Sequence, residues 1–181
     1  MEVIPYTPLC ALSEKYGTDK RPEPLGHGYT HYYDSLFPNR CRLVNKVVEI
    51  GIDTGASLRM WRDYFPNAMI YGLDCDTNKL LDEERIKSYY CDQAQIGSLQ
   101  DASFRVCGDI DFMIDDGSHQ PQHQIESARV FIPLLAPRGI YVIEDVLEPS
   151  LITPHLPYDA HIEYFKIDRD PWSKLMVIHA S

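Results

Sequence analysis

The chain has 181 residues, a mass of 20.8 kDa and a formal net charge of −10 at pH 7. This length fits one domain with a substantial core, and no apolar run reaches the roughly 20 residues that a membrane span requires. Tight binding to nucleic acid depends on an excess of Lys and Arg, which the chain does not have.

The N-terminal part, residues 1–44, is rich in Pro, Gly, Tyr and His and has no long periodic stretch. It lacks a basic start followed by an apolar run, so we expect no signal peptide. The five cysteines of the chain are scattered without a C-x-x-C pair, which is typical of a reducing cytoplasm. We expect residues 1–44 to form a cap or substrate segment on a core of residues 45–181, within a single domain.

From residue 45 onward the pattern is strand, turn and helix, repeated. Short apolar runs predict five buried strands, at residues 45–52, 68–74, 85–92, 110–116 and 139–145. Two later runs, at residues 161–167 and 174–179, predict an antiparallel hairpin at the sheet edge. The expected fold is therefore α/β: a Rossmann-like, doubly wound, mostly parallel seven-stranded sheet with a C-terminal antiparallel hairpin.

Three helices are expected between these strands. Ser57 is expected to cap the first, in which Leu58, Trp61 and Phe65 fall on one face. A short second helix is predicted around residues 80–85. Pro121 suits the first turn of the third.

The first strand ends in a turn that contains Gly51 and Gly55. Glycines let a backbone turn sharply against a ligand, and the helix that follows presents free N–H groups to an anion. Asp53 stands where the second glycine of a dinucleotide fingerprint would be, and its charge would repel a pyrophosphate. The turn therefore disfavours NAD and suits a cofactor with a carboxylate, an amine and a sulfonium.

Polar residues end the next strands in order. Asp74 is placed to accept both hydroxyls of a ribose, and Asp92 and Gln93 are placed to hydrogen-bond an adenine edge. A glycine turn followed by acids in this order predicts S-adenosylmethionine as the cofactor. We assign Asp115, at the end of the fourth strand, to the same site.

Four carboxylates are expected to meet at the carboxyl edge of the sheet, because Asp115 and Asp116 close the fourth strand and Glu144 and Asp145 close the fifth. They repel one another unless a cation or protons neutralise them. Oxygen ligands suit Mg²⁺, Mn²⁺ or Ca²⁺ better than zinc, and the preferred ligand set is Asp116, Glu144 and Asp145. His119 lies three residues after Asp116 and is a candidate general base, the alternative being a helix cap.

Several stretches resemble the family of metal-dependent sugar O-methyltransferases that modify macrolide antibiotics. These stretches follow one another in the same order as in the family and together span roughly residues 12–146. GASLRMW together with DDGSH and IEDV is a specific combination. The matching stretches are KYGTDK at residues 15–20, HGYTHYYDSLFP at 27–38, the glycine-turn region at 47–74, DQ at 92–93, IDDGSHQPQHQI at 114–125 and GIYVIEDV at 139–146.

The resemblance implies a class I methyltransferase that uses S-adenosylmethionine. It implies that Mg²⁺ is bound by Asp116, Glu144 and Asp145, and that His119 acts as the general base beside Asp116. The cofactor site that it implies is lined by Glu49, Gly51, Gly55, Ser57, Asp74 and Asp92. The N-terminal segment supplies polar groups that could close over the site, namely Lys20, Tyr29, Thr30 and Tyr33.

The expected function is O-methylation of a sugar hydroxyl, on a glycan, a polysaccharide or a glycosylated small molecule, with S-adenosylmethionine and Mg²⁺ or Mn²⁺. The antibiotic enzymes carry a long extra N-terminal portion and a larger region after the IEDV motif, so we expect a smaller or more exposed acceptor than a macrolide. Two alternatives stay open: an acceptor with a catechol-like diol, and a non-catalytic module that binds the cofactor. No nucleic acid or membrane partner is expected, and a homo-oligomer is preferred because a neighbour could complete the pocket.

Overall fold

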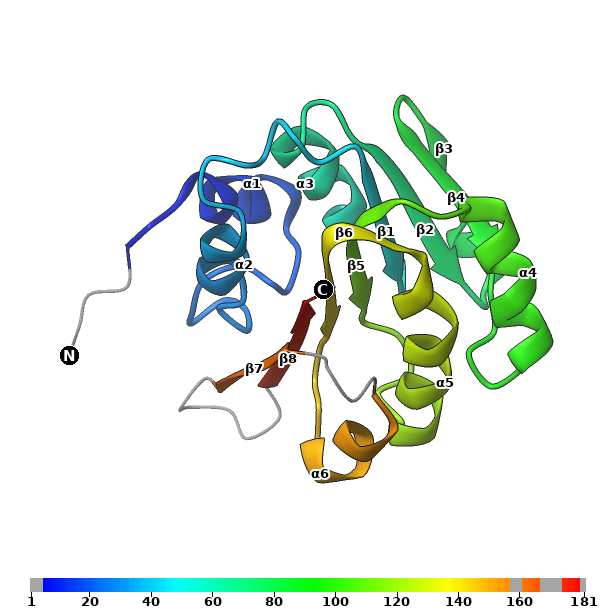
Figure 1. Ribbon diagram of the computed structural model, residues 1–181. Coiled ribbons are helices and arrows are strands. Elements are labelled where there is room, and N and C mark those ends of the chain that lie inside the picture. The colour runs from blue at the N-terminus through cyan, green and yellow to red at the C-terminus, as the bar shows by residue number, and fades with distance from the viewer. Residues whose placement is uncertain (1–4, 157–160, 167–173, 180–181) are drawn as a thin grey trace.

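The computed structural model describes residues 5–156, 161–166 and 174–179 of the chain. These residues form one mixed sheet with helices on both faces (Figure 1). The strands are β1 Lys46–Ile50, β2 Met69–Asp74, β3 Asp82–Glu83, β4 Ile86–Tyr90, β5 Ile110–Asp115, β6 Leu135–Ile143, β7 His161–Lys166 and β8 Lys174–His179. The helices are α1 Pro8–Tyr16, α2 Thr30–Leu36, α3 Ala56–Tyr64, α4 Ile96–Val106, α5 Pro121–Phe131 and α6 Pro149–Ile152, with 3-10 turns η1 Thr77–Lys79, η2 Ile132–Leu134 and η3 Thr153–His155.

The strand order is β3-β4-β2-β1-β5-β6-β8-β7. Strands β4, β2, β1, β5 and β6 pair in parallel, whereas β8 pairs antiparallel with β6 and with β7. This confirms the doubly wound sheet and the terminal hairpin. The chain winds outward in one direction from β1 and in the other from β5, so the carboxyl ends of these two strands flank the switch point, where ligands bind in such sheets.

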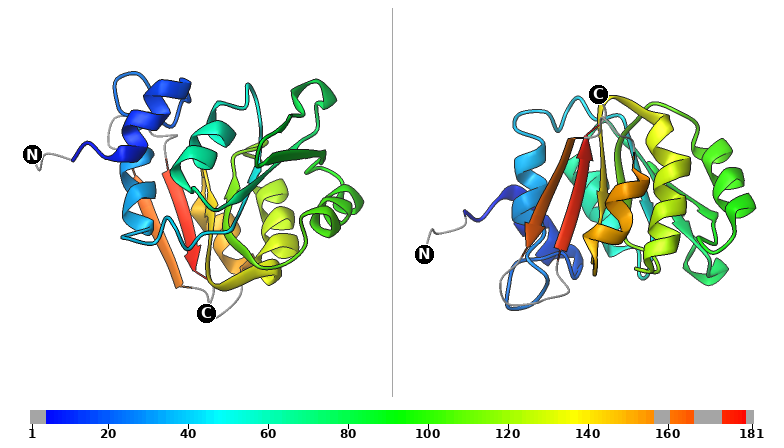
Figure 2. Two further views of the ribbon diagram at one scale, coloured as in Figure 1. Left: turned by 90° about the horizontal axis from the view of Figure 1, so that it is seen from above. Right: turned by 60° about the horizontal axis from the view of Figure 1, so that its bottom comes forward.

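Alternate residues of the central strands face two separate cores. Val47 and Phe112 belong to the core under α1, α2 and α3, while Val48 and Met113 belong to the core under α4, α5 and α6. Figure 2 shows α1 and α2 on one side of the sheet and α4 and α5 on the other. Because these strands are buried on both faces, their sequences are almost continuously apolar, and this made them predictable.

Three details of the prediction were wrong. The sheet has eight strands in the described residues rather than seven, since residues 80–85 form no helix: η1 is followed by β3, which pairs antiparallel with β4. Arg85 adopts a φ of +57° in the tight turn between these two strands. Helix α3 is preceded by Gly55, with a φ of +76°, and Ser57 lies inside the helix. Helix α4 was not predicted, although Leu99, Ala102 and Val106 form its buried stripe.

The N-terminal segment is an integral part of one helical layer. The rings of Tyr33 and Trp61 meet edge to face at 5.1 Å, and the rings of Phe37 and Phe112 do so at 4.9 Å. Such aromatic pairs contribute about 0.5–1.5 kcal/mol beyond their burial. Helices α1 and α2 are thus held to the sheet by the same core as α3. No helix among the described residues has the length and apolarity of a membrane span.

Candidate functional site

A cavity of about 560 Å³ opens at the carboxyl ends of β1, β2, β4 and β5. One wall is the loop of residues 17–20, which the N-terminal segment contributes. Seven of the predicted site residues line this cavity: Gly51, Ser57, Asp74, Asp92, Gln93, Asp116 and His119. The other five do not line the cavity and lie behind or beside its wall: Glu49, Gly55, Asp115, Glu144 and Asp145.

Gly51 is required by a close approach of two strand ends. Its φ is +94°, and a Cβ there would lie 2.0 Å from the backbone oxygen of Asp116. The Asp116 N–H donates to the Ile50 carbonyl at 2.9 Å, which holds the turn against the end of β5. Gly55 has a different role: it starts α3, and a Cβ on it would lie 2.2 Å from the Leu81 side chain.

We expect Gly51→Ala to weaken binding of S-adenosylhomocysteine strongly, because the added methyl forces the turn away from β5 and distorts the cavity wall. Calorimetric titration measures the effect. Gly97→Ala is the matched control, since a Cβ at this glycine in α4 meets no atom within 4 Å. Equal affinity in both variants would contradict the role of Gly51.

Two of the predicted acids shape the cavity through backbone contacts. Asp74 accepts hydrogen bonds from the N–H groups of Ile52 and Asp76, at 2.9 and 2.8 Å. It therefore fixes the turn after β1 as well as its own loop, and each carboxylate oxygen keeps a lone pair for a ligand hydroxyl. Asp92 accepts from the N–H of Ala94 at 2.9 Å and from the side chain of Gln95 at 2.7 Å.

Gln93 and Asp115 are hydrogen-bonded to each other. The amide nitrogen of Gln93 donates to Asp115 at 2.8 Å and to Ser127 at 2.9 Å, and its oxygen accepts from the N–H of Ser118 at 2.8 Å. Asp115 is fully buried, and this burial raises the pKa of its carboxyl to about 6. Side chains alternate along β5, so Asp115 faces the inner core while Asp116 faces the site. These contacts support the cavity wall and engage both polar atoms of the Gln93 amide, while its contact with an adenine stays a prediction.

Lys20 lies at the centre of the acidic cluster. Its side chain is 1% exposed, and its ammonium contacts Asp116, Glu144 at 3.0 Å and Glu49 at 3.4 Å. The Tyr33 hydroxyl donates to the second oxygen of Glu144. Sequence reasoning placed Lys20 among groups that could close over the site, but not between the acids.

Burial and mutual repulsion act on the protonation of this cluster. Burial raises the pKa of Glu144 well above its usual range and that of Glu49 to about 7, and Lys20 opposes both shifts. Burial alone would lower the pKa of Lys20, but its three carboxylate neighbours raise it well above its ordinary value. The carboxylates around Lys20 therefore favour its charged form.

Glu49 contacts other protein side chains and does not line the cavity. One of its oxygens accepts from Ser57 at 2.8 Å and from the indole of Trp61 at 3.1 Å, and the other faces Lys20. It thereby ties the end of β1 to the first turns of α3 and to the N-terminal loop. The predicted contact of Glu49 with the cofactor would be indirect, through Ser57.

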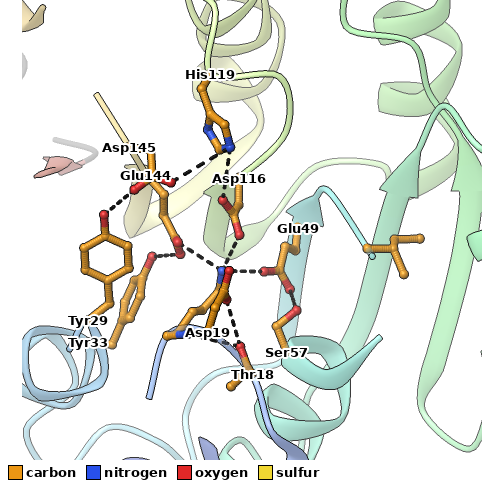
Figure 3. A network of polar contacts seen from close by, with 12 residues as sticks. Thr18, Asp19, Tyr29, Tyr33, Glu49, Ser57, Asp116, His119, Glu144 and Asp145 are labelled. Carbon is orange, nitrogen blue, oxygen red and sulfur yellow. Dashed lines mark hydrogen bonds and ion pairs between the residues drawn. The ribbon is translucent and has the colours of Figure 1, made fainter. Parts of the chain in front are cut away.

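Asp116, His119 and Asp145 bring their ligand atoms within 4.8 Å of one another. The Nε2 atom of His119 lies 3.9 Å from a carboxylate oxygen of each acid, and Asp145 also accepts from the Tyr29 hydroxyl (Figure 3). His119 and Asp145 adopt φ values of +56° and +51°. Such strained conformations of non-glycine residues concentrate at functional sites.

The donor set fits a divalent cation. Two carboxylate oxygens face one point from two strand ends, and Glu144 lies beside them with its carboxylate directed to Lys20 and Tyr33. Of the predicted ligands, Asp116 and Asp145 are brought together. The carboxylate of Glu144 would have to contact both the divalent cation and Lys20. His119 occupies the third position of the group and can act either as a ligand or as a base.

No family model matches the chain. It is 38% identical over 146 residues to the 8-demethyl-8-alpha-L-rhamnosyl tetracenomycin-C 2'-O-methyltransferase of Streptomyces olivaceus, with 76% of this chain and 37% of the relative covered. It is also 38% identical over 147 residues to the mycinamicin VI 2''-O-methyltransferase of Micromonospora griseorubida, with 76% and 36% covered. The chain thus spans little more than a third of the length of these curated relatives.

Solved structures agree with the sequence matches. The MycE methyltransferase of the mycinamycin biosynthetic pathway, in complex with Mg, SAH and mycinamycin VI, superposes with a TM-score of 0.70 and 37% identity over 77% of this chain and 39% of that chain. A second structure of MycE, with Mg and SAH, gives a TM-score of 0.75 and 28% identity over 95% of this chain and 54% of that chain. These matches confirm both the Rossmann-like methyltransferase fold and the family resemblance.

Proposed function

Because the chain belongs to the family of the sugar O-methyltransferases that it matches, we propose that it transfers the methyl group of S-adenosylmethionine to a sugar hydroxyl, with the help of Mg²⁺ or Mn²⁺. The observation that carries the proposal is one continuous cavity wall. It runs from Asp74 and Asp92, on the cofactor side, to Asp116 and His119, on the side of the acidic cluster. Cofactor and acceptor would meet where these two halves join.

On the cofactor side, the chain offers the groups that a nucleoside needs. Asp74 would accept the ribose hydroxyls, and the polar loop at Asp92 would border the adenine. Gly51 gives the ligand room beside the backbone, and the first turn of α3 presents its N–H groups near Ser57. The methionine part would then point toward Asp116 and His119.

On the acceptor side, Asp116 and Asp145 would hold the divalent cation, with Glu144 adjacent. A bound divalent cation lowers the pKa of a coordinated hydroxyl and fixes its orientation. His119 would take the proton of the acceptor hydroxyl through Nε2, the nitrogen that faces the two acids. The protein otherwise contributes position and exclusion of water, because the methyl donor is already activated.

The acceptor class is tested by assaying methyl transfer from labelled S-adenosylmethionine to two panels, terminal monosaccharides and glycosides in one and catechols in the other. We expect product from sugars that carry vicinal hydroxyls. Product from catechols alone would replace the sugar by a small-molecule diol. The absence of product from both panels, together with intact cofactor binding, would favour a non-catalytic module.

Asp74→Asn is expected to weaken binding of S-adenosylhomocysteine by about tenfold or more, since the amide removes charge and one acceptor from the ribose contacts and from the Ile52 N–H. Isothermal titration calorimetry measures the change. Asp53→Asn removes a charge from the same cavity wall without such backbone contacts and serves as the control. An affinity unchanged by Asp74→Asn would remove Asp74 from the cofactor site.

We further propose that residues 1–181 work as one unit, in which the N-terminal segment closes the acidic side of the cavity.

The proposed setting is the cytoplasm and the proposed acceptor is a sugar-linked molecule rather than nucleic acid or membrane lipid. A homo-oligomer would complete the open side of the pocket. Analytical ultracentrifugation of the purified chain tests the last point, and a monomer at micromolar concentration would contradict it.

A further inference from the structure

The N-terminal segment touches every side chain of the predicted metal-binding set. Lys20 contacts Asp116 and Glu144, Tyr33 donates to Glu144, and Tyr29 donates to Asp145. These contacts join residues separated by about a hundred positions in the chain. The loop of residues 17–20 is therefore built into the site and does more than cover it.

The backbone of Lys20 is held in place on both sides. Its N–H donates to the Thr18 hydroxyl at 3.4 Å, and its carbonyl accepts from the Thr30 N–H at 3.1 Å, at the start of α2. The whole side chain is buried, and its ammonium lies among the carboxylates that it contacts. It binds one oxygen of Asp116 and leaves the other oxygen facing His119.

The charges at this point do not balance. Glu49, Asp116, Glu144 and Asp145 carry four negative charges when ionised, and Lys20 supplies one positive charge among the described side chains that touch them. A divalent cation would reduce the remaining three negative charges to one. Without that cation, Lys20 opposes the repulsion between the acids, together with the protons that the raised pKa values of Glu49 and Glu144 favour.

We propose that Lys20 is a built-in counter-ion that keeps the carboxylates assembled while no divalent cation is bound, so that the cation enters and leaves a preformed site. Lys20 and the divalent cation then both neutralise the negative charges of the same carboxylates, each from its own side of the cluster. The proposal rests on the proposed function, because it requires a divalent cation at Asp116 and Asp145. It follows that loss of Lys20 makes the folded state depend on the cation.

The test measures the thermal midpoint of unfolding of Lys20→Met, in EDTA and in saturating Mg²⁺. In EDTA we expect a fall of about 10 °C, because removal of one partner leaves buried charges uncompensated. Saturating Mg²⁺ should recover a large part of this fall and raise the midpoint more in the variant than in the wild type. Lys15→Met is the matched control, since Lys15 lies in the same segment and pairs with Asp63 at the surface.

A second variant separates charge from packing. In Lys20→Met/Glu144→Gln one acid is neutralised, so the midpoint in EDTA should rise above that of Lys20→Met alone, whereas a loss due only to packing would not be reversed. Equal falls with and without Mg²⁺, or no gain in the double variant, would overturn the proposal. If the wild type itself binds no Mg²⁺ by calorimetry, the proposed metal dependence fails instead.

A different cluster carries a second, independent inference. His161 and His179 are directly opposite each other on β7 and β8, and Glu163 lies two residues along β7 on the same face. The Nε2 atoms of the two imidazoles lie 3.1 and 3.4 Å from one oxygen of Glu163. The Nε2 atom of His179 is buried and makes no hydrogen bond.

This cluster is separate from the cavity, because none of its three residues lines the cavity wall, and His179 pairs with Ile140, four residues before Glu144 along the chain. Two imidazoles and one carboxylate suit borderline-soft divalent ions such as Zn²⁺, Ni²⁺ or Cu²⁺, in contrast to the oxygen-rich cluster. The side chain of His161 is 70% exposed, so an ion could reach the three ligands from solvent. We infer that the β7–β8 hairpin carries a surface site for a transition-metal ion.

The probe is Zn²⁺, titrated calorimetrically into the protein in excess Mg²⁺, which occupies the oxygen-rich site. We expect one zinc site that is weakened at least about tenfold by His161→Ala and by His179→Ala. His155→Ala removes an exposed histidine outside the cluster and should leave the site intact. Zinc binding that is equal in all four proteins would overturn the inference, as would the absence of zinc binding in the wild type.

Discussion

Replacement of His119 by alanine is expected to lower the turnover of methyl transfer by about 10²–10⁴-fold, the usual contribution of a general base. A sugar hydroxyl is a weak nucleophile until it loses its proton, and Nε2 of His119 is the nitrogen that faces the acidic cluster. Asp74 and Asp92, the proposed cofactor contacts, line the other half of the cavity. Binding of S-adenosylhomocysteine should therefore change little.

The measurement is a single-turnover assay at saturating Mg²⁺, because His119 could instead act as a ligand of the cation. A base gives slow transfer at every Mg²⁺ concentration, whereas a ligand gives weaker Mg²⁺ binding with turnover that recovers at high concentration. His123→Ala is the control: its imidazole lines the same cavity, but Nδ1 is engaged by Ser118 at 2.8 Å. Unchanged turnover in His119→Ala would remove this residue from the mechanism.

Much of this site was predictable because its parts lie at strand ends. A parallel strand buried on both faces has a continuous apolar sequence, so the polar residue that follows the run marks the end of the strand. The carboxyl ends of such strands share one edge of the sheet. Asp74, Asp116 and Asp145, which the sequence separates widely, therefore reach one edge, and Asp74 and Asp116 line one cavity wall.

The contacts of Lys20 were not predictable in this way. Its partners Asp116 and Glu144 lie 96 and 124 residues further along the chain, and no periodic pattern in residues 1–44 fixes the loop that carries it. The direction in which a side chain points at the end of a strand is equally hard to predict from sequence. Asp115 and Asp116 are adjacent and both were assigned to the site, whereas the structure turns Asp115 toward Gln93 and Tyr141 and only Asp116 lines the cavity.

The identity of a helix cap also depends on three-dimensional context. Ser57 has the side chain of a cap, but the strained turn places Gly55 at that position and moves Ser57 into α3. There its hydroxyl donates to Glu49, which is buried and ion-paired with Lys20. A local preference of about 1 kcal/mol is outweighed by the need to satisfy a buried carboxylate.

Removal of divalent cations with EDTA is expected to reduce methyl transfer to the background rate, and added Mg²⁺ should restore it. Asp116 and Asp145 face one point without a protein cation between them, since Lys20 lies on the opposite oxygen of Asp116. Without the divalent cation, nothing at that point orients the acceptor hydroxyl or stabilises its deprotonated form. Full activity in EDTA would contradict the metal assignment.

The same treatment should leave binding of S-adenosylhomocysteine intact, because the proposed contacts of Asp74 and Asp92 with the cofactor use no cation. Asp145→Asn should weaken Mg²⁺ binding by about tenfold or more while Asp53→Asn, an equal change of charge on the cavity wall, should not. A calorimetric titration of Mg²⁺ into both variants distinguishes a specific ligand from a general electrostatic effect. Equal weakening in both would mean that the site attracts the cation through its net charge alone, and that the strained geometry at Asp145 has another purpose.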